Sequence, residues 1–199
     1  MGRAIHAAAS ALGIRVKSGW ASAVFVGLNA ETPIYLHRHR LLLSDPDVPQ
    51  SSQPYHRGFG SLQQDRDVIR RLTRIVHTAA RRSLQAALTE CATMGHGPQT
   101  IALVVGSTID PLTVGNEHIR AHAYEARLFR ESLERAASAA HLSCVVYRER
   151  DLSAIAAKAL GPVASSVVAA MGQTAGRPWR ADEKLAALAA WVVCDGGNQ

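Results

Sequence analysis

The chain has 199 residues, which suits one α/β domain spanning residues 1–199 with an apolar core that needs neither disulfides nor a structural metal. Hydrophobic residues make up 47% and charged residues 19% of the sequence, and this balance excludes disordered and collagen-like chains. The formal net charge of +6 favours polyanionic partners. DNA or RNA is therefore the first candidate partner.

Cysteine usage and hydropathy indicate the compartment. Cys91, Cys144 and Cys194 are widely separated and form no Cys-x-x-Cys pair, which is typical of a protein that keeps its thiols reduced. The first residues lack a signal-peptide core, and no stretch approaches the ~18 uninterrupted apolar residues of a membrane span. These features predict a cytoplasmic protein with no membrane partner.

Three β-rich runs open the chain, at residues 12–16, 20–28 and 34–43, and the short connections between them predict an antiparallel meander. Residues 44–60 are rich in Pro, Ser, Asp and Gly and are expected to form a loop. From residue 63 to residue 93 apolar side chains recur at helical spacing, which predicts one long helix.

The second half alternates strands and helices. Residues 101–105 form a continuous apolar run, typical of a strand buried on both faces, and residues 144–147 predict a fifth strand. Between them Asn116 is suited to cap a helix, whose apolar stripe consists of Ile119, Ala123, Ala126, Phe129, Leu133 and Ala140. Further helices are expected at residues 152–160, 162–171 and 179–193, with a linker over residues 172–178.

This order of elements is that of the RNase H-like fold, an α/β fold in three layers. Its five-stranded mixed sheet has a three-strand antiparallel meander followed by two parallel strands, and helices flank both faces. The opening hairpin, with Gly13-Ile14 and Gly19-Trp20-Ala21, resembles that of Holliday-junction resolvases of the RuvC type. Residues 145–161 are similar to the fifth strand and following helix of that family, and residues 178–189 resemble its last, alanine-rich helix.

The resemblance implies a metal site that this chain only partly provides. In the family four carboxylates bind two metal ions that hydrolyse a phosphodiester. They come from an aspartate on the first strand, a glutamate at the end of the fourth, and acids on the last helix. Arg15 occupies the first place and Gly106-Ser107 the second. Because Mg²⁺ takes oxygen ligands, which a guanidinium cannot supply, we expect a catalytically degenerate protein without a cofactor.

Some acids remain for an alternative site. Asp182 and Glu183 lie on the last helix, and Asp110 lies just beyond the fourth strand. If these three carboxylates formed a rearranged site, the protein would be an active phosphodiesterase that uses Mg²⁺ or Mn²⁺. A purely structural explanation is that Asp182 and Glu183 interact favourably with the helix macrodipole in its first turn.

Arg15 and Lys17 allow two interpretations. As free cations they would bind phosphate where a metal is expected in the family. Alternatively, Arg15 forms a buried salt bridge with Asp182 or Glu183. The sequence leaves both open.

The long helix carries a basic stripe that consists of Arg66, Arg70, Arg74, His77 and Arg81. These residues fall within one arc of the helical wheel, which we expect to lie opposite the apolar face. Such a stripe either follows a phosphate backbone or is a solvated outer face. An aromatic and basic strand adds to the positive charge, through Tyr35, His37, Arg38, His39 and Arg40.

A second group of residues has metal-ligand spacing. His118, His122 and Glu125 can share one helix face and form part of a metal site, although half-buried histidines are also common beside an apolar stripe. Tyr55-His56-Arg57 in the preceding loop either contacts an anion or packs the loop onto the domain.

Three functions follow from these patterns. The first is a catalytically degenerate, resolvase-like pseudoenzyme that binds nucleic acid or a nucleoprotein partner through its basic surface. The second is the metal-dependent phosphodiesterase with a rearranged acidic site. The third is a scaffold that self-associates as a homo-oligomer and has no role with nucleic acid. We favour the first, because it uses both the resemblance in fold and the missing carboxylates.

Overall fold

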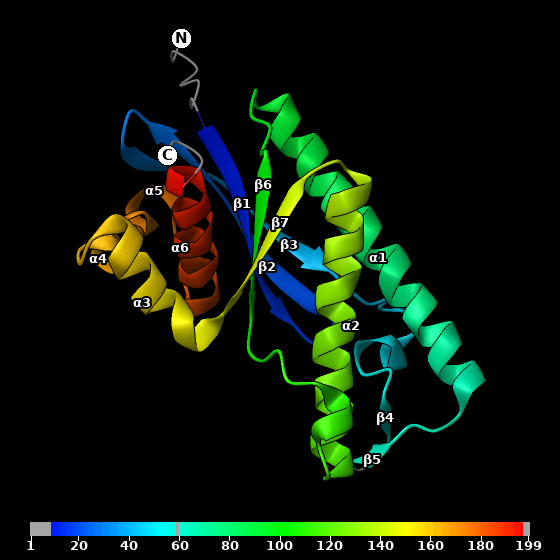
Figure 1. Ribbon diagram of the computed structural model, residues 1–199. Coiled ribbons are helices and arrows are strands. Elements are labelled where there is room, and N and C mark those ends of the chain that lie inside the picture. Colours follow the sequence, from blue (N-terminus) through cyan, green and yellow to red (C-terminus); the bar gives the residue numbers. More distant parts are fainter. Residues whose placement is uncertain (1–8, 59, 197–199) are drawn as a thin grey trace.

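The computed structural model describes residues 9–58 and 60–196 (Figure 1). Its central sheet has the strand order β3-β2-β1-β6-β7. The first three strands form an antiparallel meander, whereas β6 and β7 run parallel to β1. This confirms the predicted five-stranded mixed sheet, whose strands are β1 (Ala9–Lys17), β2 (Trp20–Asn29), β3 (Thr32–Leu42), β6 (Thr100–Val105) and β7 (Ser143–Arg148).

Helices cover both faces of the sheet (Figure 1). On one face α1 (Arg66–Thr93) and α2 (Glu117–Ala139) lie side by side and share a core with the strands. On the other face the core is completed by α3 (Glu149–Leu160), α4 (Ala164–Ala170) and α6 (Ala181–Gly196). The predicted three-layer arrangement is therefore present.

Short elements occupy segments that were expected to be irregular. The loop over residues 44–60 contains the 3-10 helix η1 (Pro49–Ser52) and the strand β4 (His56–Arg57). Strand β4 pairs with β5 (Ser61–Leu62) in a small hairpin beside α2. Likewise, the linker over residues 172–178 begins with a helical turn, α5 (Gly172–Ala175). Both expectations were too simple, because backbone hydrogen bonds form in these segments despite their Pro and Gly content.

Helix α2 begins where the sequence predicts. The side chain of Asn116 accepts a hydrogen bond from the backbone N–H of Ile119 at 3.0 Å and caps the helix. Ile119 itself was wrongly assigned to the apolar stripe, since it is 55% exposed. The first turns of α2 extend past the sheet toward the β4–β5 hairpin, so this position has no core to pack against (Figure 1).

The close packing of α6 on β1 determines what lies at the sheet edge. A Cβ added to Gly13 would come within 1.8 Å of the carbonyl oxygen of Ala186, so the two backbones nearly touch. Only a glycine on β1 and small residues on α6 permit this approach. The N-terminal turn of α6 is thereby held beside the carboxyl end of β1.

Within the described residues no single helix is long and apolar enough to cross a membrane. Among the described helices, α3 taken together with Ala164–Ala175, with a bend of 101° between them, has the length and composition of a span.

Candidate nucleic-acid interface

The carboxyl ends of β1, β6 and β7 meet at one edge of the sheet because these strands are parallel. Arg15 is in register with Val104 of β6, and Val105 is in register with Arg148 of β7. Glu149 follows β7 directly as the first residue of α3. This edge is therefore where the resemblance to resolvases places the metal-binding carboxylates.

Arg15 is buried at this edge, and its two terminal guanidinium nitrogens are engaged in contacts, whereas Nε has no hydrogen-bond partner among the described residues. Its side chain forms an ion pair with Glu149, and Nη1 donates to the carbonyl oxygen of Val16 at 2.7 Å. The Nε atom lies 3.8 Å from Oδ1 of Asp182, and the same oxygen is 3.1 Å from Nζ of Lys17. Two cations thus face two carboxylates, so their formal charges cancel. The ion-pair interpretation of Arg15 matches this geometry, with Glu149 as its main partner and Asp182 beside it.

The other candidate acids have separate structural roles. Oε2 of Glu183 accepts a hydrogen bond from the backbone N–H of Arg180 at 3.0 Å, which closes the first turn of α6 in the manner of a capping box. Asp110 caps the 3-10 helix η2 (Pro111–Thr113) and lies 3.7 Å from Arg127 on α2. Asp110, Asp182 and Glu183 do not belong to either of the two ligand clusters found among the described residues.

The basic stripe of α1 is exposed at its arginines. Arg70 forms an exposed ion pair with Asp67 at 2.9 Å. Within residues 9–58 and 60–196, Arg66, Arg74 and Arg81 have no carboxylate oxygen within 4.0 Å. These three guanidinium groups remain available to an anionic partner.

We expected the whole basic stripe to lie opposite the apolar face of α1. Its second half instead borders α2. A groove of about 270 Å³ runs between the two helices. The reason is that α2 packs beside α1 and contacts the side of α1 that carries this half of the stripe. The groove is lined by Arg74, His77, Thr78 and Arg81 from α1 and by Ser132, Arg135 and Ala136 from α2.

His77 joins the two walls of the groove. The Ser132 hydroxyl donates to the carbonyl oxygen of Leu128 at 2.7 Å, so it accepts from Nδ1–H of His77 at 2.8 Å. Burial lowers the pKa of His77, and the positive charge of Arg135 lowers it further. A neutral imidazole therefore sits among three arginines, Arg74, Arg81 and Arg135, that have no carboxylate partner in the described part of the chain.

The basic strand β3 is largely occupied by internal contacts. His37 and His39 lie 3.0 Å from the two oxygens of Glu90 on α1. The Arg38 guanidinium donates to the carbonyl oxygen of Pro178 in front of α6. Arg40 stacks over the ring of Trp20 at 4.0 Å, as expected of a cation–π contact, and lines a hollow of about 430 Å³ beside Asp182.

The histidine group on α2 is joined by a histidine from outside the helix. His118 and His122 are exposed, whereas Glu125 is 1% exposed and lies 2.7 Å from Nδ1 of His56 on β4. Burial raises the pKa of Glu125, and the hydrogen bond from His56 opposes this rise. Burial and the neighbouring histidines lower the pKa of His122. The hairpin is packed on α2, as one interpretation of Tyr55-His56-Arg57 predicted.

Two participants were missed by sequence reasoning, Glu149 and Arg135, and His56 was singled out without its place beside His118 and His122. Glu149 had a usable signal, because a residue that directly follows a parallel strand lies at the same sheet edge as Arg15. The role of Arg135 and the place of His56 had none, since both depend on how α1, α2 and the hairpin pack together.

Comparisons with known proteins agree with the fold. The sequence matches no protein-family model and no curated protein. The structure is similar to Thermus thermophilus RuvC in complex with a Holliday-junction substrate, at a TM-score of 0.58 and 11% identity over 96% of this chain and 95% of RuvC. A second RuvC structure from that organism gives a TM-score of 0.53 and 14% identity over 95% of each chain.

The yeast mitochondrial resolvase Ydc2 is also similar, with a TM-score of 0.51 and 10% identity over 96% of this chain and 78% of Ydc2. All of these identities are low, and what the structures share with this chain is the arrangement of helices and strands. The chain therefore has the RNase H-like fold in the form found in RuvC-type Holliday-junction resolvases.

Proposed function

We propose that this protein binds nucleic acid through the groove between α1 and α2 and does not hydrolyse it by the two-metal reaction. The observation that carries the proposal is the set of three arginines around the groove, Arg74, Arg81 and Arg135, which lack carboxylate partners among the described residues. A guanidinium binds a phosphate through two parallel hydrogen bonds, so an unpaired arginine in a polar hollow suits a phosphate backbone.

The length of the stripe also fits a nucleic-acid strand. Arg66 and Arg81 are separated by about 22 Å along α1, given a rise of about 1.5 Å per residue. A B-DNA strand carries one phosphate per about 3.4 Å of helix axis, so the stripe runs alongside about six phosphates. The exposed arginines of α1 are thus spaced to contact a backbone at several points.

The sheet edge supports the second half of the proposal. Lys17 and Arg15 neutralise Asp182 and Glu149, so the carboxylates that remain at this edge are already paired with cations. A divalent ion would have to displace a buried arginine to reach them. Mg²⁺ and Mn²⁺ prefer sites made of oxygen ligands, and here the guanidinium of Arg15 occupies the centre of the site.

Binding is tested by titrating a labelled four-way DNA junction, a DNA duplex and a single-stranded RNA with the protein at several salt concentrations. A four-way junction is the first choice because one RuvC neighbour is solved with such a substrate. Three to four phosphate contacts predict that log K falls with log salt at a slope of about −3 to −4 on duplex DNA. The absence of binding to all three nucleic acids at low salt would overturn the proposal.

Hydrolysis is tested on the same junction with Mg²⁺ and then Mn²⁺. We expect the junction to remain intact at protein concentrations that saturate it. Metal-dependent cleavage that disappears in Asp182→Asn would instead establish the phosphodiesterase with a rearranged acidic site.

A further inference from the structure

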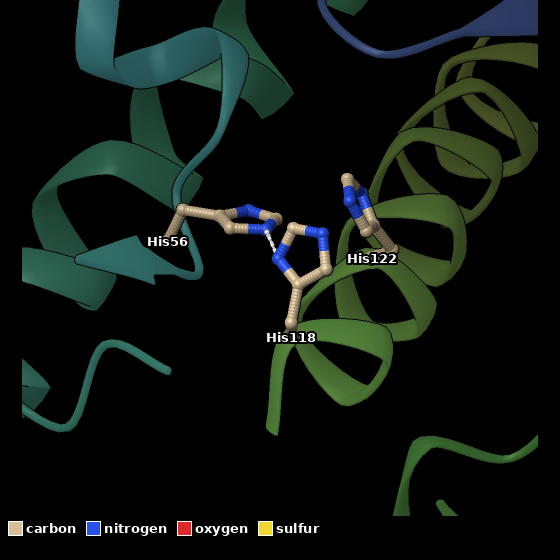
Figure 2. Close-up of side chains that lie close together, drawn as sticks. All are labelled: His56, His118 and His122. Carbon is tan, nitrogen blue, oxygen red and sulfur yellow. Dashed lines mark hydrogen bonds between the residues drawn. The ribbon is translucent and has the colours of Figure 1, made fainter. Parts of the chain in front are cut away.

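Three histidines from two distant segments converge beside the N-terminal end of α2 (Figure 2). His118 and His122 lie one turn apart on α2, and His56 approaches them from β4. The ring of His122 has its centroid 4.5 Å from that of His56 and 4.6 Å from that of His118. Each histidine offers one nitrogen atom such that all three atoms lie within 4.8 Å of one another.

We propose that His56, His118 and His122 bind one divalent transition-metal ion, for which Zn²⁺ is the representative. Nε2 of His56 and Nδ1 of His118 are 3.3 Å apart. Two nitrogen ligands of a tetrahedral zinc ion, each about 2.0–2.1 Å from the metal, are separated by about 3.3 Å. This pair of rings therefore already has the spacing that the ion requires.

A buried carboxylate orients the first ligand. Nδ1 of His56 lies 2.7 Å from Oε1 of Glu125, and the two side chains are 8% and 1% exposed. With its proton on Nδ1, His56 presents the lone pair of Nε2 toward His118. Histidine ligands of metals commonly donate their other N–H to a carboxylate in this way, which fixes the tautomer and makes the ring a better donor.

The second oxygen of Glu125 points to the same assignment. Oε2 is buried and has no hydrogen-bond partner among the described residues, and it lies 3.7 Å from Nδ1 of His122. A buried carboxylate oxygen without a partner carries a cost of about 1–3 kcal/mol. Rotation of the His122 ring toward the cluster would give this oxygen a donor while leaving the other ring nitrogen free for the metal.

The hairpin that supplies His56 is held against α2 independently of the histidines. Tyr55 stacks on Tyr124 of α2 with the ring centroids 4.9 Å apart, and its backbone N–H donates to Glu125 at 3.3 Å. Gly60, with a φ of +82°, brings the following backbone so close that a Cβ there would lie 3.2 Å from Nδ1 of His118. The packing of the hairpin on the helix therefore holds His56 and His118 in place, and the ring of His122 completes the cluster by rotation.

The ligand set determines the kind of metal and of site. Imidazole nitrogens suit Zn²⁺, Ni²⁺ and Cu²⁺ rather than Mg²⁺ or Ca²⁺. Three protein ligands with an exposed side leave a fourth position for water, whereas structural zinc sites are closed by four protein ligands. His118 and His122 are both exposed, so this fourth position opens to solvent. The site is separate from the sheet edge at Arg15 and does not depend on nucleic-acid binding.

The chain offers a natural control in a second cluster, made of His37, His39 and Glu90. Both histidines there lie 3.0 Å from oxygens of the same carboxylate, so the three groups already satisfy one another. A metal would have to break both contacts. We therefore assign the metal to the three-histidine cluster.

The test is a competition titration of the full chain with Zn²⁺ and a chromophoric chelator. We expect one equivalent to bind, with affinity reduced by more than about 100-fold in the double variant His118→Ala/His122→Ala, because only one ligand remains. Glu125→Gln is expected to weaken binding by about 10- to 100-fold, as is typical when the carboxylate behind a ligand is changed. The control double variant His37→Ala/His39→Ala should bind Zn²⁺ as the wild type does.

Further measurements distinguish the loss of the metal site from a loss of folding. Both altered histidines on α2 are exposed, so the double variant should keep its circular dichroism spectrum, and a rise in Tm on adding Zn²⁺ should occur only in proteins with the intact cluster. Co²⁺ should give the visible absorption bands of a four-coordinate site in the wild type and in the control variant, but not in His118→Ala/His122→Ala. The proposal is overturned if the His118→Ala/His122→Ala variant binds Zn²⁺ as tightly as the wild type, or if the control variant is the one that loses binding.

Discussion

The guanidinium of Arg15 and the carboxylate of Glu149 form an ion pair that joins β1 to the first residue of α3 across 134 positions of sequence. The Arg15 side chain is 6% exposed and that of Glu149 is 43% exposed, so the cation is buried and its counterion reaches the surface. The pair occupies the sheet edge at which the resemblance to resolvases implies metal ligands. The carboxylates of Glu149 and Asp182 are therefore engaged by Arg15 and Lys17 at this edge.

Replacing Arg15 should be costly for stability. Arg15→Ala leaves Glu149 without its partner and removes the hydrogen bonds to the carbonyl oxygens of Val16 and Val104, so we expect the free energy of unfolding to fall by about 2–4 kcal/mol. Urea denaturation measures the change. Arg148→Ala is the control, because its ion pair with Asp151 is more exposed and should be worth less than about 1 kcal/mol. Equal losses in the two variants would show that the buried pair has no special role.

Gly13 is predicted to be nearly irreplaceable. Gly13→Ala would drive a methyl group into the backbone of α6 at Ala186, so the helix would have to move away from β1. We expect a loss of about 3 kcal/mol or more, at the upper end of overpacking effects. Gly106→Ala is the matched control, since a Cβ there meets nothing within 4 Å. Thermal unfolding of the two variants compares them, and a mild effect at Gly13 would contradict the close packing of α6.

His77 should make stability depend on pH. The pKa of His77 in the folded protein lies below the ordinary value of 6.5, so the unfolded chain takes up the proton before the folded protein does as the pH falls. The free energy of unfolding should therefore rise with pH as the pH approaches 6.5 from below and gain nothing more from this group above it. His77→Gln should remove this part of the pH dependence, as measured by urea denaturation at several pH values. If the difference in free energy of unfolding between the variant and the wild type stayed constant across pH 5–7, the effect would be excluded.

The three cysteines should resist modification in the folded protein. Burial raises the pKa of Cys91 and of Cys194 to about 12 and that of Cys144 to about 11, so almost no thiolate is present at pH 8. A thiol reagent should label the native protein slowly and label all three thiols at once after unfolding. Rapid labelling of the native chain at Cys91 or Cys194 would contradict the burial of these two side chains, whereas Cys144 is half-buried.

Much of the fold was predictable because its signals are local. The apolar runs of β1, β2 and β6 and the Asn116 cap of α2 are each encoded in a few consecutive residues. The first turn of α2 shows the limit of such patterns. Ile119 continues the helical stripe in sequence but is exposed, because the helix extends beyond the sheet that would have covered it.

The candidate sites were less predictable because they depend on contacts between distant segments. Arg15 was recognisable as a departure from the family pattern, yet its partner Glu149 follows β7, which is two strands away in the sheet and distant in sequence. His118 and His122 had metal-ligand spacing, yet the third histidine lies on a hairpin within a segment that was expected to be a plain loop. The basic stripe was recognisable in the sequence, but its position beside α2 depends on how the two helices pack together.

The most direct test of the central claim compares two double variants of α1 for binding to a four-way DNA junction. Arg74→Ala/Arg81→Ala removes two arginines of the groove, whereas Arg71→Ala/Arg82→Ala removes the same charge from exposed positions elsewhere on the helix. We predict that the groove variant binds at least about 10-fold more weakly and that its salt slope falls by about two, one per lost phosphate contact. The control variant should stay within about threefold of the wild type. Equal affinities for the two variants would contradict a nucleic-acid interface in this groove.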